Sequence, residues 1–377
     1  MTNNKDRQDG GVSAARAKER SVREPLFHVV KRAQLPLWKS IGIRIGAIVA
    51  ALLLCGIMCF FLLDINPLTF YKTMIEGSFG TERRLWKLFK DIAVLLCISL
   101  AVTPAFKMRF WNIGAEGQVL VGCLATVACM RSLGGKIPEP LLMVIMLAAA
   151  LAAGAIWGLI PAVFKAKWGT NETLFTLMMN YVATYLVAYF LIKWTPNGSS
   201  TLGRLDHGHL PKILDNEYLL TIIVVALLTV GMFIYLKYTK QGYEISVVGE
   251  SQKTAGYIGI NVKTVIIRTM IISGALCGLA GLMIVGALDH SVTTESAGGQ
   301  GFTAIMVSWL AKFDPFTMVL TAFLIVFLQQ GADRISSIFN ISNAFPSIIT
   351  GIILFFIIGC EFFINYKVVF TGRENKR

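Results

Sequence analysis

The sequence predicts an all-α polytopic membrane protein with about ten transmembrane helices and both termini in the cytoplasm. Three observations lead to this class: of the 377 residues 55% are hydrophobic, only 15% are charged, and the mean hydropathy is +0.64. Soluble domains contain about 25% charged residues. The apolar residues form long runs, as a bilayer requires. This pattern excludes a disordered, fibrous or disulfide-stapled secreted protein.

Ten stretches have the length and apolar content of membrane-spanning helices. A helix needs about 20 mostly apolar residues to cross a hydrocarbon core of about 30 Å. The stretches at 110–131 and 299–312 fit least well, because polar residues and glycines interrupt them. The ten expected spans cover residues 41–63, 90–106, 110–131, 141–164, 173–194, 218–237, 267–287, 299–312, 314–331 and 345–364.

The distribution of cations sets the orientation of these spans. With the amino terminus in the cytoplasm, ten spans place both termini and most of the 35 Lys and Arg residues on the cytoplasmic side, in line with the positive-inside rule. This bias accounts for the net charge of +13 without a nucleic acid partner. Segment 64–90 is the main exception, and we expect it to form an external helix on the membrane surface; its cations are Lys72, Arg83, Arg84, Lys87 and Lys90.

The chain divides into a membrane domain and two tails. Residues 1–40 form a basic cytoplasmic tail, of which 1–26 are expected to be disordered because they are polar and charged. Residues 27–39 mix aromatic and cationic side chains and predict an interfacial helix, with Trp38 at the level of the lipid headgroups. The membrane domain covers 41–366, with a long cytoplasmic loop at 238–266, and 367–377 form a cytoplasmic carboxyl-terminal tail.

Residues typical of enzymes and metal sites are sparse. The seven cysteines fall in apolar spans without a Cys-x-x-Cys pair, and we expect them to be packing residues. His207 and His209 share a loop that offers no third ligand, so no metal site is expected. The sequence contains no P-loop and no evident nucleophile–base pair. We therefore expect neither an enzyme nor a cofactor in this chain, and any nucleotide-derived energy must come from another subunit.

Polar residues interrupt the third and fifth spans. Asn112 and Glu116 are spaced to share one helical face, and Gln118 follows them. A carboxylate at membrane depth is unfavourable unless it is paired or faces a water-filled path. Glu116 is therefore expected either to line a substrate path or to bond a neighbouring helix. Asn180, about two turns into the fifth span, fits an interhelical hydrogen bond and a substrate contact equally well.

The segment at 237–263 is long for a connector in a helical bundle. Its centre, Glu250–Tyr257, has the composition of a short helix that Gly259 would end. Such a helix, parallel to the membrane, suits docking to a soluble partner; a plain solvated loop is the alternative. Farther along, Gly274 and Gly278 predict close packing of helices, and 296–302 predict loose backbone beside a cavity.

Five motifs in fixed order give the sequence a family resemblance. They are FWNIGAEGQVLVG, GTNETLFTLMMNY, GYEISVVGESQKTAGYIGINV, ISGALCGLAGL and GGQGFTAIMVSWLAKFDPF. Over about residues 65–365 the chain resembles the permease subunit of a bacterial ABC importer, in the nucleoside-type branch of the branched-chain amino acid and simple-sugar permease superfamily. It departs from the family at Ser308–Lys312, where a small-residue Ala-Leu-Leu-Gly stretch is common.

The resemblance implies a permease that works by alternating access in the bacterial cytoplasmic membrane, with partners on both sides. A substrate path would lie between this chain and a second, homologous permease subunit. Two cytoplasmic ATPase domains would bind and hydrolyse ATP, and an extracytoplasmic lipoprotein would capture the substrate. The segment Glu250–Tyr257 matches the family's coupling helix, and the residues expected to contact the ATPase are Glu250, Lys253, Ala255, Gly256 and Tyr257.

The Gly-Gly-Gln-Gly-Phe motif resembles the nucleoside-type version and favours nucleosides as substrate. A nucleoside offers hydroxyls and a flat base, so its path should present amides, a carboxylate and aromatic faces. Two alternatives remain open: sugars or branched-chain amino acids carried by the same machine, and a proton-coupled secondary transporter in which Glu116 carries the proton. The expected path residues are Asn112, Glu116, Gln118 and Asn180, with Trp111 and Phe302 as stacking surfaces.

Overall fold

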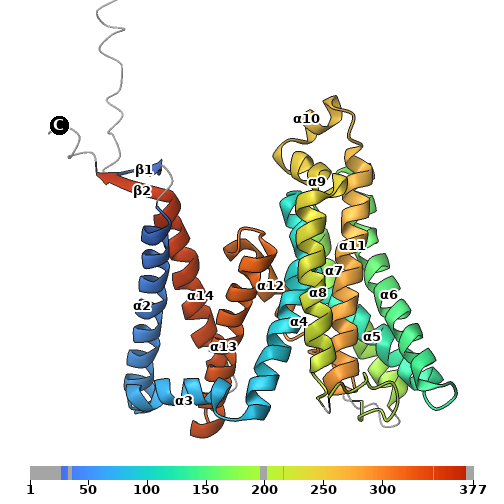
Figure 1. Ribbon diagram of the computed structural model, residues 1–377, viewed down its shortest axis with the longest axis horizontal. Helices are drawn as coiled ribbons and strands as arrows, with labels where there is room; N and C mark the ends of the chain where they lie inside the picture. Colours follow the sequence, from blue (N-terminus) through green and yellow to red (C-terminus); the bar gives the residue numbers. More distant parts are fainter. Residues whose placement is uncertain (1–26, 33–35, 196–201, 215, 343, 371–377) are drawn as a thin grey trace, which may run out of the picture. The chain divides into compact units, whose positions relative to one another are not determined.

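The computed structural model describes residues 27–32, 36–195, 202–214, 216–342 and 344–370. The chain forms two compact units, one made of residues 1–64 and 351–377 and the other of residues 65–350. The expectation that 1–26 are disordered lies outside the described residues. Figure 1 gives the course of the chain, and each unit is described by itself.

In the first unit, two strands far apart in the chain pair with each other. Strand β1 (Phe27–Lys31) runs antiparallel to β2 (Tyr366–Phe370), so that Val29 pairs with Val368. These strands are rich in valine, whose branched side chain favours extended backbone. The expected interfacial helix over 27–39 is therefore wrong in its first part, and its end belongs to α2 (Leu37–Leu63). Arg44 of α2 forms an ion pair with Glu361 of α14 (Ala344–Asn365).

The second unit is a bundle of helices. Its elements follow in the order α3 (Pro67–Phe79), α4 (Glu82–Lys107), α5 (Ala115–Leu133), α6 (Glu139–Trp168), α7 (Glu172–Trp194), α8 (Leu219–Tyr238), α9 (Lys240–Glu250), α10 (Gln252–Tyr257), α11 (Val262–Ile284), the π-helical turn η1 (Val285–Asp289), α12 (Gln300–Leu310) and α13 (Pro315–Phe339), before the start of α14.

Eight helices in the described part of the chain are long and apolar enough to cross a membrane: α2, α4, α6, α7, α8, α11, α13 and α14. The expectation of ten spans is met except at the two stretches that fitted least well. The first of these became α5, whose 19 residues begin with a polar turn. The second became α12, which has only 11 residues. At 1.5 Å per residue α12 is about 17 Å long, too short to cross a core of about 30 Å.

Helix α4 is the centre of the second unit. It packs against α8, α11, α12 and α13, and almost every residue from Leu88 to Phe106 is buried. The expected external helix over 64–90 is corrected here. The chain turns at Gly80, α3 ends at Phe79, and the last nine residues of that segment belong to α4. Lys90 consequently lies inside the bundle, with only 8% of its surface exposed.

The close packing expected from Gly274 and Gly278 is confirmed. A Cβ atom on Gly278 would lie 2.1 Å from the carbonyl oxygen of Ala150, and one on Gly274 would lie 2.2 Å from that of Gly154. Both contacts join α11 to α6. No side chain fits at these distances, so the crossing of these helices depends on glycine.

Helices α9 and α10 form an elbow at one end of the bundle, as Figure 1 shows at the top. Ser251 begins α10 by accepting a hydrogen bond from the backbone N–H of Thr254. Gly259, in the left-handed region at φ +85°, follows it. The short helix expected at Glu250–Tyr257 is thus present, although Glu250 is the last residue of α9.

Candidate functional site

The carboxylate of Glu116, in the first turn of α5, holds the first turn of α12. Its Oε1 accepts a hydrogen bond from the backbone N–H of Gly299 and its Oε2 one from Gly301, both at 2.8 Å. A Cβ on Gly301 would lie 2.4 Å from the backbone nitrogen of Glu116, so glycine permits the approach. A carboxylate also offsets the partial positive charge of a helix N-terminus. Of the two roles expected for Glu116, the bond to a neighbouring element is present, and a role in a substrate path stays a prediction.

The three amides expected in the path form buried contacts around the turn between α4 and α5. Asn112 is fully buried and donates to Ser273 Oγ at 3.3 Å and to Gln118 Oε1 at 3.4 Å. Asn180 Oδ1 on α7 accepts from the backbone N–H of Gly117 at 2.9 Å. These bonds fix the irregular backbone of 108–114 against α5, α7 and α11. As the helices are arranged here, the amides position this loop.

Three aromatic rings, one in that loop and two on α12, are partly exposed. Trp111 is 44% exposed, Phe302 39% and Trp309 49%. The rings of Trp111 and Trp309 lie 5.2 Å apart and are tilted by 54°. We call Trp111, Phe302 and Trp309 the aromatic face. Trp309 was not among the expected residues, although its position seven residues after Phe302, on the same side of a helix, was the signal that could have identified it.

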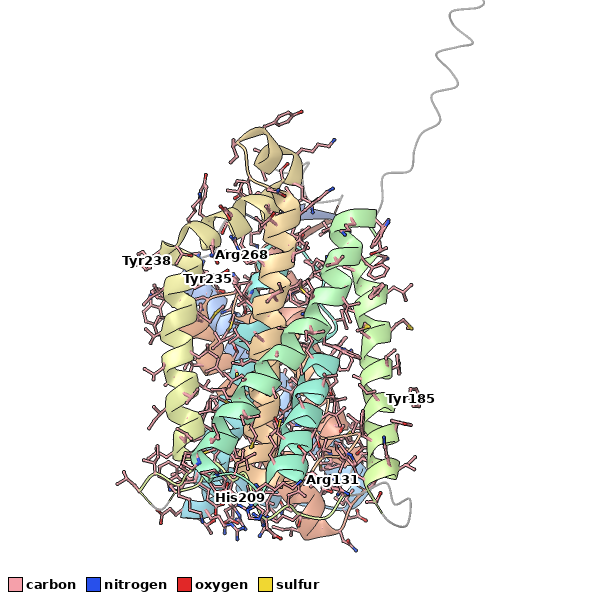
Figure 2. All side chains as sticks on the ribbon, turned by 90° about the vertical axis from the view of Figure 1, so that its right-hand side faces the viewer. Arg131, Tyr185, His209, Tyr235, Tyr238 and Arg268 are labelled. Carbon is pink, nitrogen blue, oxygen red and sulfur yellow. The ribbon has the colours of Figure 1, made fainter. Side chains whose placement is uncertain are left out.

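The expected ATPase-coupling residues lie on the elbow, and most of them face outward. Glu250, Lys253, Gly256 and Tyr257 are exposed, with Tyr257 at 90%. Ala255 differs, because it is fully buried against a cluster that includes Ala105, Ile245 and Val265. Ala255 therefore anchors α10 to the bundle instead of offering an edge to a partner. Figure 2 shows Tyr235 and Arg268 beneath this elbow, where Arg268 pairs with Glu244 at 2.8 Å.

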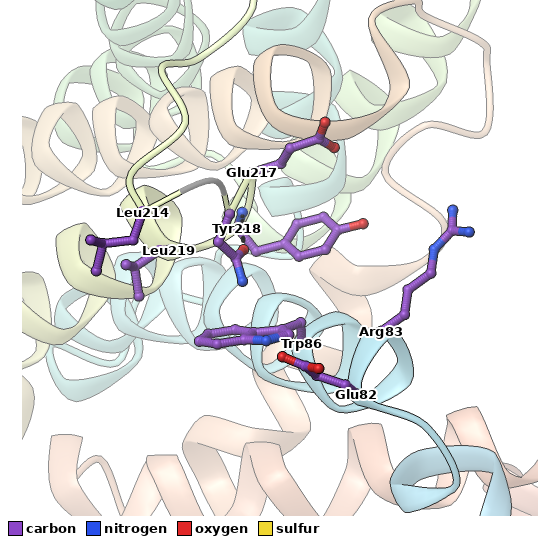
Figure 3. Close-up of a pocket in the computed structure, with 8 residues that line it drawn as sticks. Glu82, Arg83, Trp86, Leu214, Glu217, Tyr218 and Leu219 are labelled. Atoms are coloured by element: carbon purple, nitrogen blue, oxygen red, sulfur yellow. Dashed lines mark hydrogen bonds between the residues drawn. The ribbon is translucent and has the colours of Figure 1, made fainter.

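The opposite end of the bundle holds a cavity of about 630 Å³ between the start of α4 and the loop that precedes α8. In Figure 3 the rings of Trp86 and Tyr218 lie on either side of it. Glu217 at its rim bonds Lys212 at 2.6 Å, and this hydrogen bond holds the pKa of the Glu217 carboxyl below its usual value. The rim also carries Glu82 and Arg83. This end of the molecule is thus a charged surface with an aromatic hollow.

The histidines expected to lack a third ligand have protein partners. His207 Nδ1 lies 2.9 Å from Glu139, and the ring of His209 stacks on His290 at 3.7 Å. Among the residues that the structure describes, no group of three or more His, Cys, Asp or Glu could hold a metal ion.

Comparison with known proteins identifies the family. Residues 85–358 match the family described as branched-chain amino acid transport system / permease component. The chain belongs to this family. The expected resemblance is confirmed, and as a member of this permease family the chain is a multi-pass protein of the cell membrane and a transporter component.

Three relatives indicate how far the similarity extends. The guanosine ABC transporter permease protein NupP of Bacillus subtilis is 31% identical over 76% of this chain and 84% of its own length. The nucleoside ABC transporter permease protein NupB of Lactococcus lactis subsp. cremoris is 26% identical over 78% and 84%. The glucose ABC transporter permease protein TsgB13 of Haloferax volcanii is 27% identical over 91% and 94%. Permease subunits with different cargoes are therefore similar to this chain along most of its length.

Proposed function

We propose that this chain is the membrane-spanning subunit of an ATP-driven importer of nucleosides. The observation that carries the proposal is the family membership, with permeases for guanosine and for nucleosides among the relatives. The aromatic face supports the choice of substrate. A nucleobase is flat and stacks on such rings, whereas a branched-chain amino acid has no flat ring to offer.

The arrangement of the site suggests different roles for its aromatic rings and its amides. Trp111 and Trp309 offer partly exposed rings, while Asn112, Gln118 and Asn180 hold the loop that carries Trp111. In this proposal the amides keep the rings in place and come into reach of a substrate when α12 moves against α5. Glu116 joins those two helices. Movement of α12 would therefore present both the aromatic rings and polar groups to the cargo.

The partners belong to the same proposal. The exposed elbow of α9 and α10 would dock on a cytoplasmic ATP-binding subunit, which supplies ATP as the energy source. The charged end around Glu82, Arg83 and Glu217 would receive a substrate-binding lipoprotein. A second permease subunit would complete the path. With this orientation α10 lies on the cytoplasmic side.

Two alternatives to an ATP-driven nucleoside importer have different support. A sugar cargo is compatible with the family, since a glucose permease is similar to this chain. A proton-coupled carrier is disfavoured, because the relatives are ABC transporter permeases and because backbone hydrogen bonds to both oxygens of Glu116 favour its charged form. Proton relays need a carboxylate that exchanges its proton during each cycle.

An uptake assay in cells that express the complete transporter tests the proposal. Uptake of radiolabelled uridine should require ATP and persist when a protonophore collapses the proton gradient. Excess guanosine should compete, whereas excess glucose or leucine should not. Loss of uptake with the protonophore alone would contradict an ATP-driven importer. Absence of uridine uptake together with ATP-dependent uptake of radiolabelled glucose would replace the nucleoside with a sugar.

A further inference from the structure

A second polar cavity lies inside the second unit, in the half of the bundle away from α10. It has a volume of about 310 Å³ and is enclosed by α4, η1, α12 and α13. This size is at the lower end of the range of about 300–1,000 Å³ that is usual for small-molecule sites. We call it the Lys90 cavity, and its polar inner wall consists of Lys90, Asp91, Gln300, Thr303 and Gln330.

The polar groups of this wall are only partly satisfied by one another. Lys90, nine-tenths buried, places its Nζ 2.5 Å from Asp91 Oδ1, and Gln330 Nε2 donates to Asp91 Oδ2 at 2.9 Å. The Oε1 atoms of Gln300 and Gln330 are buried and accept no hydrogen bond from any described residue. An unsatisfied buried acceptor costs about 1–3 kcal/mol. Buried groups left in this state point to a ligand.

The unsatisfied groups specify the chemistry of that ligand. The two amide oxygens need donors, while the Lys90 ammonium has three N–H donors and needs further acceptors. A hydroxyl both donates and accepts, so adjacent hydroxyls match this wall better than a purely apolar or purely anionic group. None of the described residues that line the cavity is aromatic. The cavity is thus suited to a polyol and not to a flat base.

The rim of the cavity argues against an anionic ligand. It carries Lys87, Asp289, Gln329 and Asp333. Together with Lys90 and Asp91 these residues give two positive and three negative side chains, so the lining has a small net negative charge. A phosphate would be repelled, because like charges in a partly dehydrated site are unfavourable. A neutral polyol meets no such barrier.

We propose that the Lys90 cavity is a binding site for a neutral polyol, and that it takes the ribose hydroxyls of the nucleoside. The assignment to ribose rests on the proposed function. Helix α12 connects the two parts of the substrate: Gln300 and Thr303 line the cavity, and Phe302 between them belongs to the aromatic face. One short helix thereby contributes both to the ribose site and to the rings available to the base.

Protection from chemical labelling tests the site directly. Gln329, exposed at the rim, is replaced by cysteine in the complete transporter reconstituted in nanodiscs, and its reaction with a cationic methanethiosulfonate reagent is timed. Uridine and free D-ribose at millimolar concentration should slow the reaction at least threefold. Inorganic phosphate and 2′,3′-dideoxyuridine should not. The parent protein, whose cysteines are mostly buried, gives the background rate.

Transport by single variants gives the second measurement. Gln300→Ala and Gln330→Ala should each reduce uridine uptake about tenfold, as expected for the loss of one hydrogen bond to the ligand. Uptake of 2′,3′-dideoxyuridine should change less than twofold. Thr229→Ala is the matched control, because this buried hydroxyl on α8 bonds only the carbonyl of Val225 and does not line the cavity.

The outcomes separate the two proposals. If the parent transports uridine but neither uridine nor ribose slows the labelling, the cavity holds water only and the inference is wrong. An equal loss for both nucleosides in the variants would also overturn it, because a purely structural defect does not distinguish hydroxyls. If the parent transports no nucleoside, the proposed function fails, and protection by D-ribose still decides whether the cavity binds a polyol.

Discussion

The carboxylate of Glu116 and the backbone N–H of Gly301 lie 2.8 Å apart and join α5 to the first turn of α12. The second oxygen of Glu116 accepts from Gly299 at the same distance. Because α12 carries Phe302 and Trp309, this one carboxylate determines where most of the aromatic face stands. The pair therefore couples a polar group inside the bundle to a surface available for substrate.

Replacing Glu116 by glutamine should weaken this junction without preventing assembly. One acceptor remains, but the new NH2 group cannot accept from a backbone N–H, and a charge-assisted hydrogen bond worth about 1.5–3 kcal/mol is lost. We expect uridine uptake to fall and the melting temperature of the purified transporter to decrease. Glu295→Gln, at an exposed position in the preceding loop, is the control and should change neither. Normal uptake by Glu116→Gln would assign this residue a structural role alone.

The contact between α11 and α6 gives a prediction about stability. Gly278→Ala places a methyl group where a carbonyl oxygen of α6 already lies, 2.1 Å away, and the helices must separate. Overpacking of this kind typically costs about 1–3 kcal/mol. The yield of folded protein and its melting temperature in detergent should both fall. Gly231→Ala on α8, where nothing lies within 4 Å, should leave them unchanged or slightly raised. Equal behaviour of the two variants would show that the crossing can relax.

Features set by local pattern were predictable from the sequence, and those set by distant partners were not. The spacing of Gly274 and Gly278 predicted a close crossing of two helices. The run Glu250–Tyr257 predicted the short helix of the elbow. Both signals lie within a few residues of the chain. Strands β1 and β2 were not predicted, because the residues that pair with one another are more than 330 positions apart in the chain. Periodicity alone does not indicate such a pairing.

The polar residues of the site show the same difference between what a local pattern indicates and what distant partners determine. Asn112, Glu116 and Asn180 were conspicuous as polar groups in apolar stretches, yet their partners became known only with the fold. Lys90 was assigned to the surface because a cluster of cations precedes it. Its burial depends on Asp91 and on Gln330 of α13, which lies 239 residues after Asp91. The Lys90 cavity could therefore not be found from sequence, since four separate elements build it.

Acid should destabilise the loop that contains His290. Burial, with smaller contributions from His209 and Arg204, lowers the pKa of the His290 ring from 6.5 to about 4, and only Glu217 opposes them. The unfolded chain then binds a proton that the folded chain does not, so the stabilising contribution is complete above pH 6.5 and decreases as the pH falls towards 4. At pH 5 the loss should be on the order of 2 kcal/mol.

Melting curves at pH 7.5 and 5 for the parent and for His290→Asn measure this effect. Asparagine tolerates the left-handed backbone at this position, φ 46°, and does not titrate. The variant should lose much less stability on acidification than the parent. The same decrease in both proteins would attribute the acid effect to other groups.

Tyr257 provides the most direct test of the elbow as the contact with an ATPase. It is 90% exposed at the end of α10, so the described residues cover only about a tenth of this aromatic side chain. An aromatic ring that becomes buried on docking commonly contributes about 2 kcal/mol or more, so Tyr257→Ala should weaken association with the ATP-binding subunit about thirtyfold. Because Ala255 still anchors α10, the fold should persist. We therefore expect a normal melting temperature for the permease alone, loss of the ATPase on co-purification, and loss of substrate-stimulated ATP hydrolysis.

Tyr185→Ala is the control for Tyr257→Ala. Figure 2 shows Tyr185 on α7, far from the elbow, and its side chain is 73% exposed. If both variants co-purify with the ATPase and hydrolyse ATP like the parent, α10 is an ordinary loop and the subunit must dock elsewhere.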